Sequence, residues 1–338
     1  MDGDVECCDR GFHACESPME VFDHCDMLSS RFAEVEQSGK IDKEDNSTKV
    51  CSSRIKIKAE LKLADIINLG VEWLKEITAP SKVKANNSSN NGNYAQIGSS
   101  GNSAKIGSSG YSAQIGSSGN YAQIGSSGNY AQIGSSGNSA QIGSSGNYAQ
   151  IGSSGNYAKI GSSGNSAKIG SSGNSAKIGS SGYSAQIGSS GYSAQIGSSG
   201  NSAQIGSSGN YAQIGSSGYY AKIGSSGNSA QIGSSGNSAQ IGSSGNSAKI
   251  GSSGNYAQIG SSGDSAQIDS SGRNSVVMCA GFDSKAKAAI GSWITLAEWK
   301  RIGGVWKPIC VKTEQVDGNR IKADTYYKLI NGKFEEVE

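Results

Sequence analysis

The sequence predicts a mainly β fold, a two-sided parallel β-solenoid with a small α/β N-terminal head and an antiparallel β cap at the C-terminal end. Isoleucine recurs every nine residues from Ile97 to Ile268, through twenty copies of Gly-Asn-[Ser/Tyr]-Ala-[Gln/Lys]-Ile-Gly-Ser-Ser. Glycine accounts for 50 of the 338 residues and phenylalanine for only 5. In a strict period, such a composition marks a stacked repeat rather than a flexible linker. Two hairpin-type dipeptides near the C-terminus, Asp317-Gly318 and Asn331-Gly332, predict the antiparallel cap.

Each nonapeptide supplies one strand and one turn. We assign the strand to [Ser/Tyr]-Ala-[Gln/Lys]-Ile, which points Ala and Ile inward and the polar or tyrosine side chains outward. Gly-Ser-Ser-Gly-Asn then forms the corner, because glycine and asparagine tolerate positive φ. Two nonapeptides make an 18-residue coil with two sheets. A three-sided coil of three nonapeptides is the alternative, and the small Ala/Ile core favours two sheets.

The chain divides into five segments by its composition and pattern. They are an α/β head at 1–78, a polar linker at 79–92, the solenoid at 93–268, degenerate rungs at 269–292 and a β cap at 293–338. The two degenerate rungs are expected at Asn274–Met278 and Ala288–Ser292.

Four secondary-structure elements are predicted within the head. Ser17 and Pro18 suit the N-cap and first position of a helix that runs to Cys25. Phe32–Val35 and Val50–Ala59 have the composition of strands, and apolar residues recur at helical spacing over Lys62–Ile77.

Charge and cysteine usage bound the location and partners of the chain. The net charge is +2, which gives no strong overall field for nucleic acid or membranes. No apolar run follows the acidic Met1–Asp4, and no stretch reaches the length of a membrane span, so neither a signal peptide nor a membrane partner is expected. The seven cysteines suit reduced thiols in a cytoplasm.

Cysteine and histidine cluster in the head and raise the question of a metal or reactive site. The residues concerned are Cys8, His13, Cys15, His24 and Cys25. Their spacing matches no standard zinc knuckle, so buried thiols and hydrogen-bonded imidazoles are the favoured interpretation. A reactive His–Cys pair would need a lowered thiol pKa and an orienting third group. The repeats resemble the calcium-binding nonapeptide β-roll in period alone, since their turns carry Ser-Ser, so no calcium or other cofactor is expected.

Tyrosine and lysine on the outward positions of the array are the candidate binding residues. Tyr130 and Tyr148 lie two repeats apart, so a two-sided coil makes them neighbours on one face. Lys159 and Lys177 have the same spacing. Such a face suits a protein or glycan ligand, and the alternative is that tyrosine simply covers the sheet.

Both ends of the chain resemble an uncharacterised family of bacterial and phage-borne proteins that carry short-period repeats between a head and a tail. The resemblance rests on Cys8–Pro18, which contains the Gly-Phe-His-Ala-Cys motif, on Ser30–Gly39 and Ser53–Lys58 in the head, and on Ile321–Leu329 in the tail. It implies relatedness to a phage or mobile element and supplies no known activity.

We therefore expect a non-enzymatic structural or binding scaffold. A nucleic-acid or host-factor binding protein that uses the Lys/Tyr-bearing face is one alternative, although nucleic acid is disfavoured as a partner. Salt-dependent retention on DNA would identify it. An enzyme seated in the head around His13 and Cys15 is the other alternative.

Overall fold

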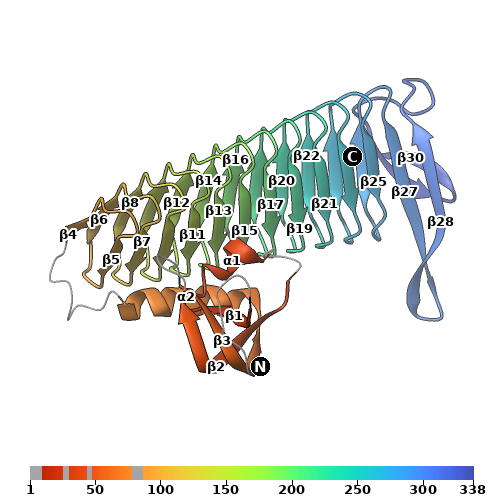
Figure 1. Cartoon of the computed structure of the whole chain (residues 1–338). Helices are drawn as coiled ribbons and strands as arrows, with labels where there is room; N and C mark the ends of the chain where they lie inside the picture. The colour runs from red at the N-terminus through yellow and green to blue at the C-terminus, as the bar shows by residue number, and fades with distance from the viewer. Residues whose placement is uncertain (1–9, 26–29, 44–47, 78–86) are drawn as a thin grey trace. The chain divides into compact units, whose positions relative to one another are not determined.

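A computed structural model of the chain describes residues 10–25, 30–43, 48–77 and 87–338. Its contacts divide it into two units, residues 1–140 with 150–154 and residues 141–149 with 155–338. The first unit holds the head and the first coils of the array, and the second holds the later coils and the cap (Figure 1). None of the described helices has the length and apolar character needed to cross a membrane.

The head is a three-stranded antiparallel sheet in the order β1-β3-β2 with two helices. Its elements are β1 Phe12–Cys15, α1 Val21–His24, β2 Phe32–Lys43, β3 Lys49–Leu61 and α2 Leu63–Ile77. Met19, Phe22, Phe32 and Ile66 form a buried cluster, and the rings of Phe22 and Phe32 meet edge to face at 5.7 Å between centroids.

Two predictions for the head need correction. The strands are longer than expected, because β2 and β3 pair along most of their length through two register shifts. The first helix is shorter and does not begin at Ser17. The backbone N–H of Ser17 donates to Thr48 Oγ1 at 3.0 Å, so this residue is bound to the segment before β3, and Glu20 precedes the helix instead. The helix predicted at 62–77 is confirmed within one residue.

The repeats form a parallel β-solenoid whose strands alternate between two sheets. Even-numbered strands β4 to β26 belong to a 14-stranded sheet, and odd-numbered strands β5 to β27 belong to a 13-stranded sheet. The strand bounds are β4 Asn87–Ser89, β5 Gln96–Ser99, β6 Lys105–Ser108, β7 Gln114–Ser117, β8 Gln123–Ser126, β9 Gln132–Ser135, β10 Gln141–Ser144, β11 Gln150–Ser153, β12 Lys159–Ser162, β13 Lys168–Ser171, β14 Lys177–Ser180, β15 Gln186–Ser189, β16 Gln195–Ser198, β17 Gln204–Ser207, β18 Gln213–Ser216, β19 Lys222–Ser225, β20 Gln231–Ser234, β21 Gln240–Ser243, β22 Lys249–Ser252, β23 Gln258–Ser261 and β24 Gln267–Ser270.

The strand register confirms the two-sided coil. Ile214 pairs with Ile196 on one side and with Ile232 on the other, so equivalent residues stack at a spacing of two repeats. A three-sided coil would stack residues three repeats apart and is excluded. Each buried isoleucine contributes about 2–3 kcal/mol to stability.

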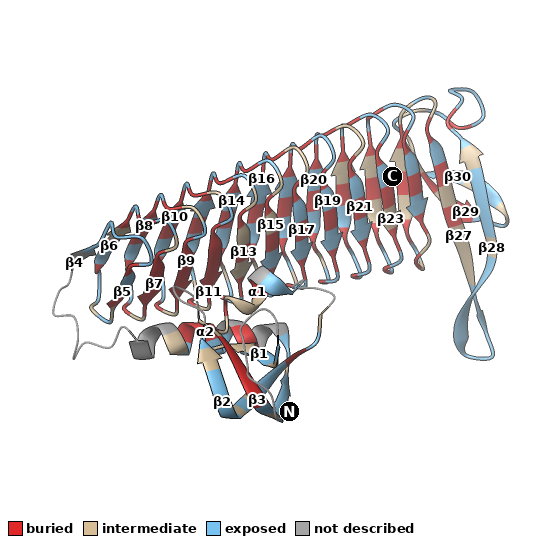
Figure 2. Ribbon diagram, in the orientation of Figure 1, coloured by how far each residue is buried: buried red, intermediate tan, exposed pale blue. Residues whose placement is uncertain are grey.

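The strands lie two residues later in the repeat than predicted. Numbering a repeat from its first glycine makes Gly209–Ser217 positions 1 to 9, and the strand Gln213–Ser216 covers positions 5 to 8. Along it, buried and exposed residues alternate, so isoleucine and the serine at position 8 point inward while glutamine and the glycine at position 7 point outward. Figure 2 shows the same alternation along β16 and β20. Alanine at position 4 is buried as predicted, but it follows the turn instead of lying in the strand.

The inward serine and the first glycine together close the corner. Ser198 Oγ accepts a hydrogen bond from the backbone N–H of Gly200 at 3.3 Å, which orients the chain as it leaves the strand. Position 1 must be glycine because the coils approach closely there. A Cβ atom on Gly227 would lie 1.9 Å from the carbonyl oxygen of Gly209 in the preceding coil.

Two degenerate rungs and two hairpins end the chain. The rungs are β25 Val276–Cys279, which overlaps the first predicted segment, and β26 Lys285–Ala288, which lies earlier than predicted. The hairpin β27 Trp293–Ile302 with β28 Val305–Gln315 extends the 13-stranded sheet, and β29 Tyr326–Ile330 with β30 Lys333–Val337 extends the 14-stranded sheet. Asn331-Gly332 forms a hairpin turn as predicted, but the other hairpin turns at Gly303-Gly304.

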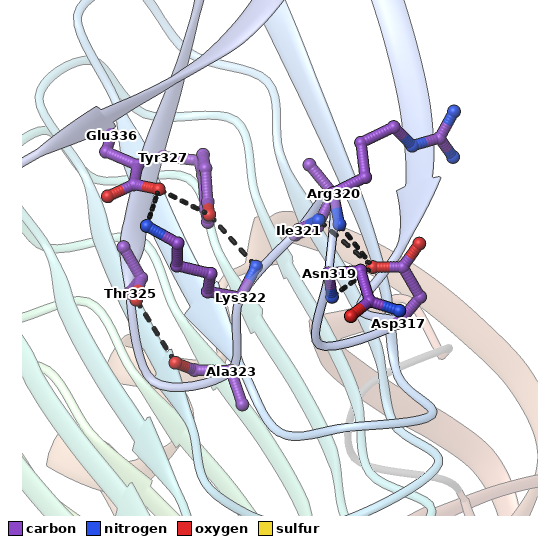
Figure 3. Close-up of polar contacts among 9 residues, drawn as sticks. All are labelled: Asp317, Asn319, Arg320, Ile321, Lys322, Ala323, Thr325, Tyr327 and Glu336. Carbon is purple, nitrogen blue, oxygen red and sulfur yellow. Dashed lines mark hydrogen bonds and ion pairs between the residues drawn. The ribbon is translucent and has the colours of Figure 1, made fainter.

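Asp317-Gly318 instead belongs to the connection between the two hairpins. The Asp317 carboxylate accepts hydrogen bonds from the backbone N–H groups of Asn319, Arg320 and Ile321 at 2.9, 2.9 and 3.1 Å (Figure 3). These three bonds hold the pKa of the Asp317 carboxyl below its ordinary value, and the N–H of Asn319 makes the largest contribution.

Candidate binding surfaces on the solenoid

The candidate tyrosines lie in the turns at the corners of the coil, not in the outward strand positions that the sequence predicted. Tyr130 and Tyr148 occupy position 3 of their repeats with φ of 59° and 60°, in the left-handed region. Both are exposed. A side chain at position 3 therefore points away from the coil, two residues before the next strand begins. The expected neighbour relation between Tyr130 and Tyr148 stays a prediction.

Two turn conformations occur in blocks along the corners. In the turn Gly209–Ala212, Tyr211 has a φ of 59°, as in a type II turn, and its N–H donates forward to the carbonyl of Asn228 in the next coil at 2.9 Å. In the turn of Ser184 the peptide is reversed, because its N–H donates back to the carbonyl of Asn165 in the preceding coil at 2.8 Å.

Asparagine at position 2 stabilises the first of these conformations. Asn210 Oδ1 accepts the backbone N–H of Asn228 at 3.0 Å, and Asn228 Oδ1 accepts that of Asn246 at 3.0 Å. The amides thus form a ladder from coil to coil. Asp264 continues it, since its Oδ1 accepts the N–H of Phe282 at 3.0 Å.

Tyrosine at position 2 breaks this ladder, because a phenol ring has no amide oxygen to place over the next coil. The residues that follow the four position-2 tyrosines all lack the positive φ of the first conformation. These residues are Ser112, Ser184, Ser193 and Tyr220. Position-2 tyrosines therefore lie in corners whose peptide is reversed.

The reversal extends to the asparagine turn one coil before three of these tyrosines. The turns of Asn165, Asn174 and Asn201 also lack a positive φ at position 3. The carbonyl of Asn201 points forward and accepts the N–H of Tyr220 at 2.8 Å. In a reversed corner the backbone N–H at position 3 points toward the preceding coil. This N–H finds a carbonyl acceptor when the corner of the preceding coil is reversed as well.

Tyrosine rings from successive coils meet at the corners. The ring centroids of Tyr192 and Tyr211 lie 5.3 Å apart, and those of Tyr111 and Tyr130 lie at the same distance. Desolvation, and then the neighbouring Tyr211, raise the pKa of the Tyr192 phenol. The sequence prediction missed these pairs, because it counted only position-3 tyrosines and looked for contacts at a spacing of exactly two repeats. The signal was a tyrosine at position 2 followed by a tyrosine at position 3 one coil later.

One tyrosine hydroxyl is also fixed by an asparagine. Asn201 Nδ2 donates to the hydroxyl of Tyr183 at 3.0 Å, one coil away. Tyr183 stays 57% exposed, so the ring presents an open apolar face although its hydroxyl is held. Such a ring offers a flat stacking surface at low entropic cost.

The structure brings Lys159 and Lys177 together as predicted by their spacing. They begin β12 and β14, are directly opposite in the parallel register of the 14-stranded sheet, and are both exposed. A Cβ atom built on Gly161 or Gly179, two residues along each strand, would meet nothing within 4 Å. The two cations therefore border an open strip of backbone.

The candidate metal ligands do not gather into a site within the described part of the chain. Cys8 lies outside the described residues. His13 and Cys15 lie on β1, while His24 ends α1 and Cys25 follows it. Among the described residues, no group of three or more His, Cys, Asp or Glu side chains is placed to hold a metal ion.

Comparison with known proteins adds a family for the head alone. Residues 1–69 match the model of a family described as a domain of unknown function (DUF7666). The match confirms the resemblance of the head to an uncharacterised family. No curated protein and no solved structure is detectably similar to the chain.

Proposed function

We propose that the chain is a non-enzymatic binding scaffold whose array holds an extended polymer, a polysaccharide, along the tyrosine-bearing corners. The observation that carries this proposal is the pairing of exposed tyrosines between successive coils, with ring centroids 5.3 Å apart at Tyr192 and Tyr211 on one corner of the coil and at Tyr111 and Tyr130 on the other. Single exposed apolar residues need no explanation, but exposed rings that lie against each other are typical of a binding surface.

Three features favour a sugar polymer as the ligand. Tyrosine combines an apolar ring face with a hydroxyl, which suits the apolar face and hydroxyl rim of a sugar. The surrounding side chains are asparagine, serine and glutamine, which donate and accept hydrogen bonds without charge. Tyrosines at several coils of one array present more than one weak site to a long chain, and linked sites raise the overall affinity.

The sequence of the array itself supplies fold-safe variants for a test. Tyr192→Asn and Tyr211→Ser convert their repeats to the residues found at the same positions of neighbouring repeats. We expect the double variant to fold normally and to lose at least about tenfold in retention on the polysaccharide that binds the wild type, because each lost stacking contact is worth about 1 kcal/mol.

The matched control is Gln213→Ser with Gln231→Ser, which changes two exposed strand residues and leaves the corners intact. Affinity electrophoresis through gels that contain cellulose derivatives, glucans, chitin derivatives or acidic polysaccharides supplies the measurement. Migration unaffected by every polymer, or equal retention of wild type and tyrosine variant, contradicts the proposal.

A nucleic acid on the 14-stranded sheet is the second candidate. Like charges opposite each other in a sheet, as at Lys159 and Lys177, are destabilising without a counter-ion, which a phosphate backbone provides. Retention on DNA that falls steeply with salt and is lost in Lys159→Gln/Lys177→Gln supports this candidate.

The cytoplasmic location remains part of the proposal and is supported by an odd number of cysteines, seven, whose clustering does not suggest a disulfide framework. Relatedness to a phage likewise stays an expectation.

A further inference from the structure

The β27–β28 hairpin projects beyond the sheet that carries it. Pairing of β27 with β25 ends at Leu296, which lies opposite Cys279, whereas pairing with β28 continues to Ile302 opposite Val305. Six residues of strand past Leu296 span about 20 Å. Figure 1 shows the turn of this hairpin well beyond the ends of the neighbouring strands, and every residue from 300 to 309 is exposed (Figure 2).

Two tryptophans hold one face of the hairpin toward the corner that precedes β26. Trp299 Nε1 donates to the backbone carbonyl of Ala280 at 3.0 Å, and the Trp306 ring lies against Phe282 at 4.1 Å between centroids. Trp306 is paired with Arg301 across the hairpin, so these two side chains share that face. One face of the projection is therefore held by these two contacts, and its opposite face is exposed.

The exposed face of the hairpin is apolar beside the turn and cationic at the next residue pair on that face. Ile302 and Val305 are directly opposite each other beside the turn, and both are exposed. Lys300 and Lys307 form the next pair on the same face, about 7 Å along the strands. Two like charges directly opposite each other are destabilising in a sheet unless an anion lies between or above them.

The charge of the hairpin end is uniformly positive. Residues 299–309 contain Lys300, Arg301 and Lys307 and no aspartate or glutamate, and Glu298 just before this segment accepts the backbone N–H groups of Asn331 and Gly332. None of these three cations forms an ion pair with a described residue. An anionic, partly apolar partner complements this surface in both respects.

We propose that the tip of the β27–β28 hairpin binds the surface of an anionic lipid bilayer. Ile302 and Val305 enter the boundary between headgroups and acyl chains, while Lys300 and Lys307 pair with lipid phosphates at the depth of the headgroups. Such binding needs no membrane-spanning segment.

The other occupants fit the surface less well. A second copy that pairs edge to edge along β28 brings the lysines of one hairpin toward those of the other, with no acid in either tip to neutralise them. A nucleic acid satisfies the cations but leaves Ile302 and Val305 in water, because its phosphates and base edges are polar. A bilayer supplies anions and an apolar layer at adjacent depths.

The test is flotation of the full chain with two kinds of vesicle. One contains phosphatidylcholine alone, and the other also contains about 30% of the anionic lipid phosphatidylglycerol. We expect binding to the anionic vesicles alone. Lys300→Gln/Lys307→Gln is expected to weaken it by about thirtyfold, and Ile302→Ser/Val305→Ser by at least about tenfold. The matched control Lys159→Gln/Lys177→Gln removes the same charge from the array and is expected to bind like the wild type.

All six of these positions are exposed, so the variants are expected to keep the wild-type melting temperature. Absence of flotation with anionic vesicles overturns the proposal. Equal weakening by the array control also overturns it, since the binding then reflects total charge. A hairpin-dependent dimer in analytical ultracentrifugation without vesicle binding assigns the tip to a second copy, and hairpin-dependent DNA retention without vesicle binding assigns it to nucleic acid.

Discussion

Asn228 Oδ1 accepts the backbone N–H of Asn246, one coil further along the array, at 3.0 Å. This bond couples the two corners, because the side chain of one coil satisfies the backbone of the next. The ladder therefore fixes the conformation of a turn by a contact with the neighbouring coil. Tyrosine at position 2 lies in reversed corners, so tyrosine and the ladder asparagine exclude each other at this position.

Removal of the ladder side chain at one coil is expected to destabilise the array modestly. Asn228→Ala leaves the N–H of Asn246 to water and should cost about 0.5–1.5 kcal/mol of the free energy of unfolding. Asn228→Asp keeps an acceptor oxygen, as Asp264 does in its own coil, and should retain most of that stability. Urea unfolding of both variants measures the difference. Equal losses in the two would show that the amide oxygen does not hold the corner.

Substitution by alanine is expected to change stability very differently at two neighbouring glycines, Gly227 and Gly224. Gly227→Ala places Cβ against the carbonyl of Gly209 and should cost about 3 kcal/mol or more, because the coils cannot separate without breaking the ladder of strands. Gly224→Ala adds a methyl group where nothing lies within 4 Å, and should be neutral or stabilising by up to about 1 kcal/mol. Thermal unfolding of the two variants is the measurement. Similar melting temperatures would contradict the close approach at position 1.

The inward and outward strand positions should differ sharply in their tolerance of charge. Ile178 is 3% exposed, so Ile178→Asp removes a core side chain and buries a carboxylate without a partner, at a cost of at least about 4 kcal/mol. Gln186→Glu lies on the outer face opposite Lys168 and should change stability by no more than about 0.5 kcal/mol. Circular dichroism melts compare them, and parallel losses would refute the assignment of the two faces.

Acid should weaken the connection between the two hairpins through Asp317. Its folded pKa lies below the ordinary value, so the stabilisation is complete above the unfolded pKa of about 3.9 and is lost as the pH falls through the folded pKa. Asp317→Asn keeps an acceptor that does not titrate. Its melting temperature should therefore fall less than that of the wild type between about pH 4 and pH 2. Identical acid limbs would show that the three N–H bonds do not favour the charged form.

The sequence by itself determined the solenoid, because a nine-residue period with one isoleucine per repeat can bury its apolar face only by stacking. It also favoured the two-sided coil, since a core of alanine and isoleucine is thin enough to be closed by two sheets. It did not determine where the strand begins. Ala212 and Ile214 point inward whether the strand covers positions 3 to 6 or positions 5 to 8 of the repeat. The alternation of inward and outward residues is therefore compatible with both assignments.

Only the tertiary structure decided which residues form the turn, because that choice depends on contacts between coils. The close approach of Gly227 to Gly209 and the asparagine ladder join residues of successive coils, and a local pattern does not reveal them. The same holds for the hairpin at Gly303-Gly304. Its strands extend beyond the neighbouring strand because β25 has only four residues to pair with β27. This leaves Ile302 and Val305 exposed at the tip.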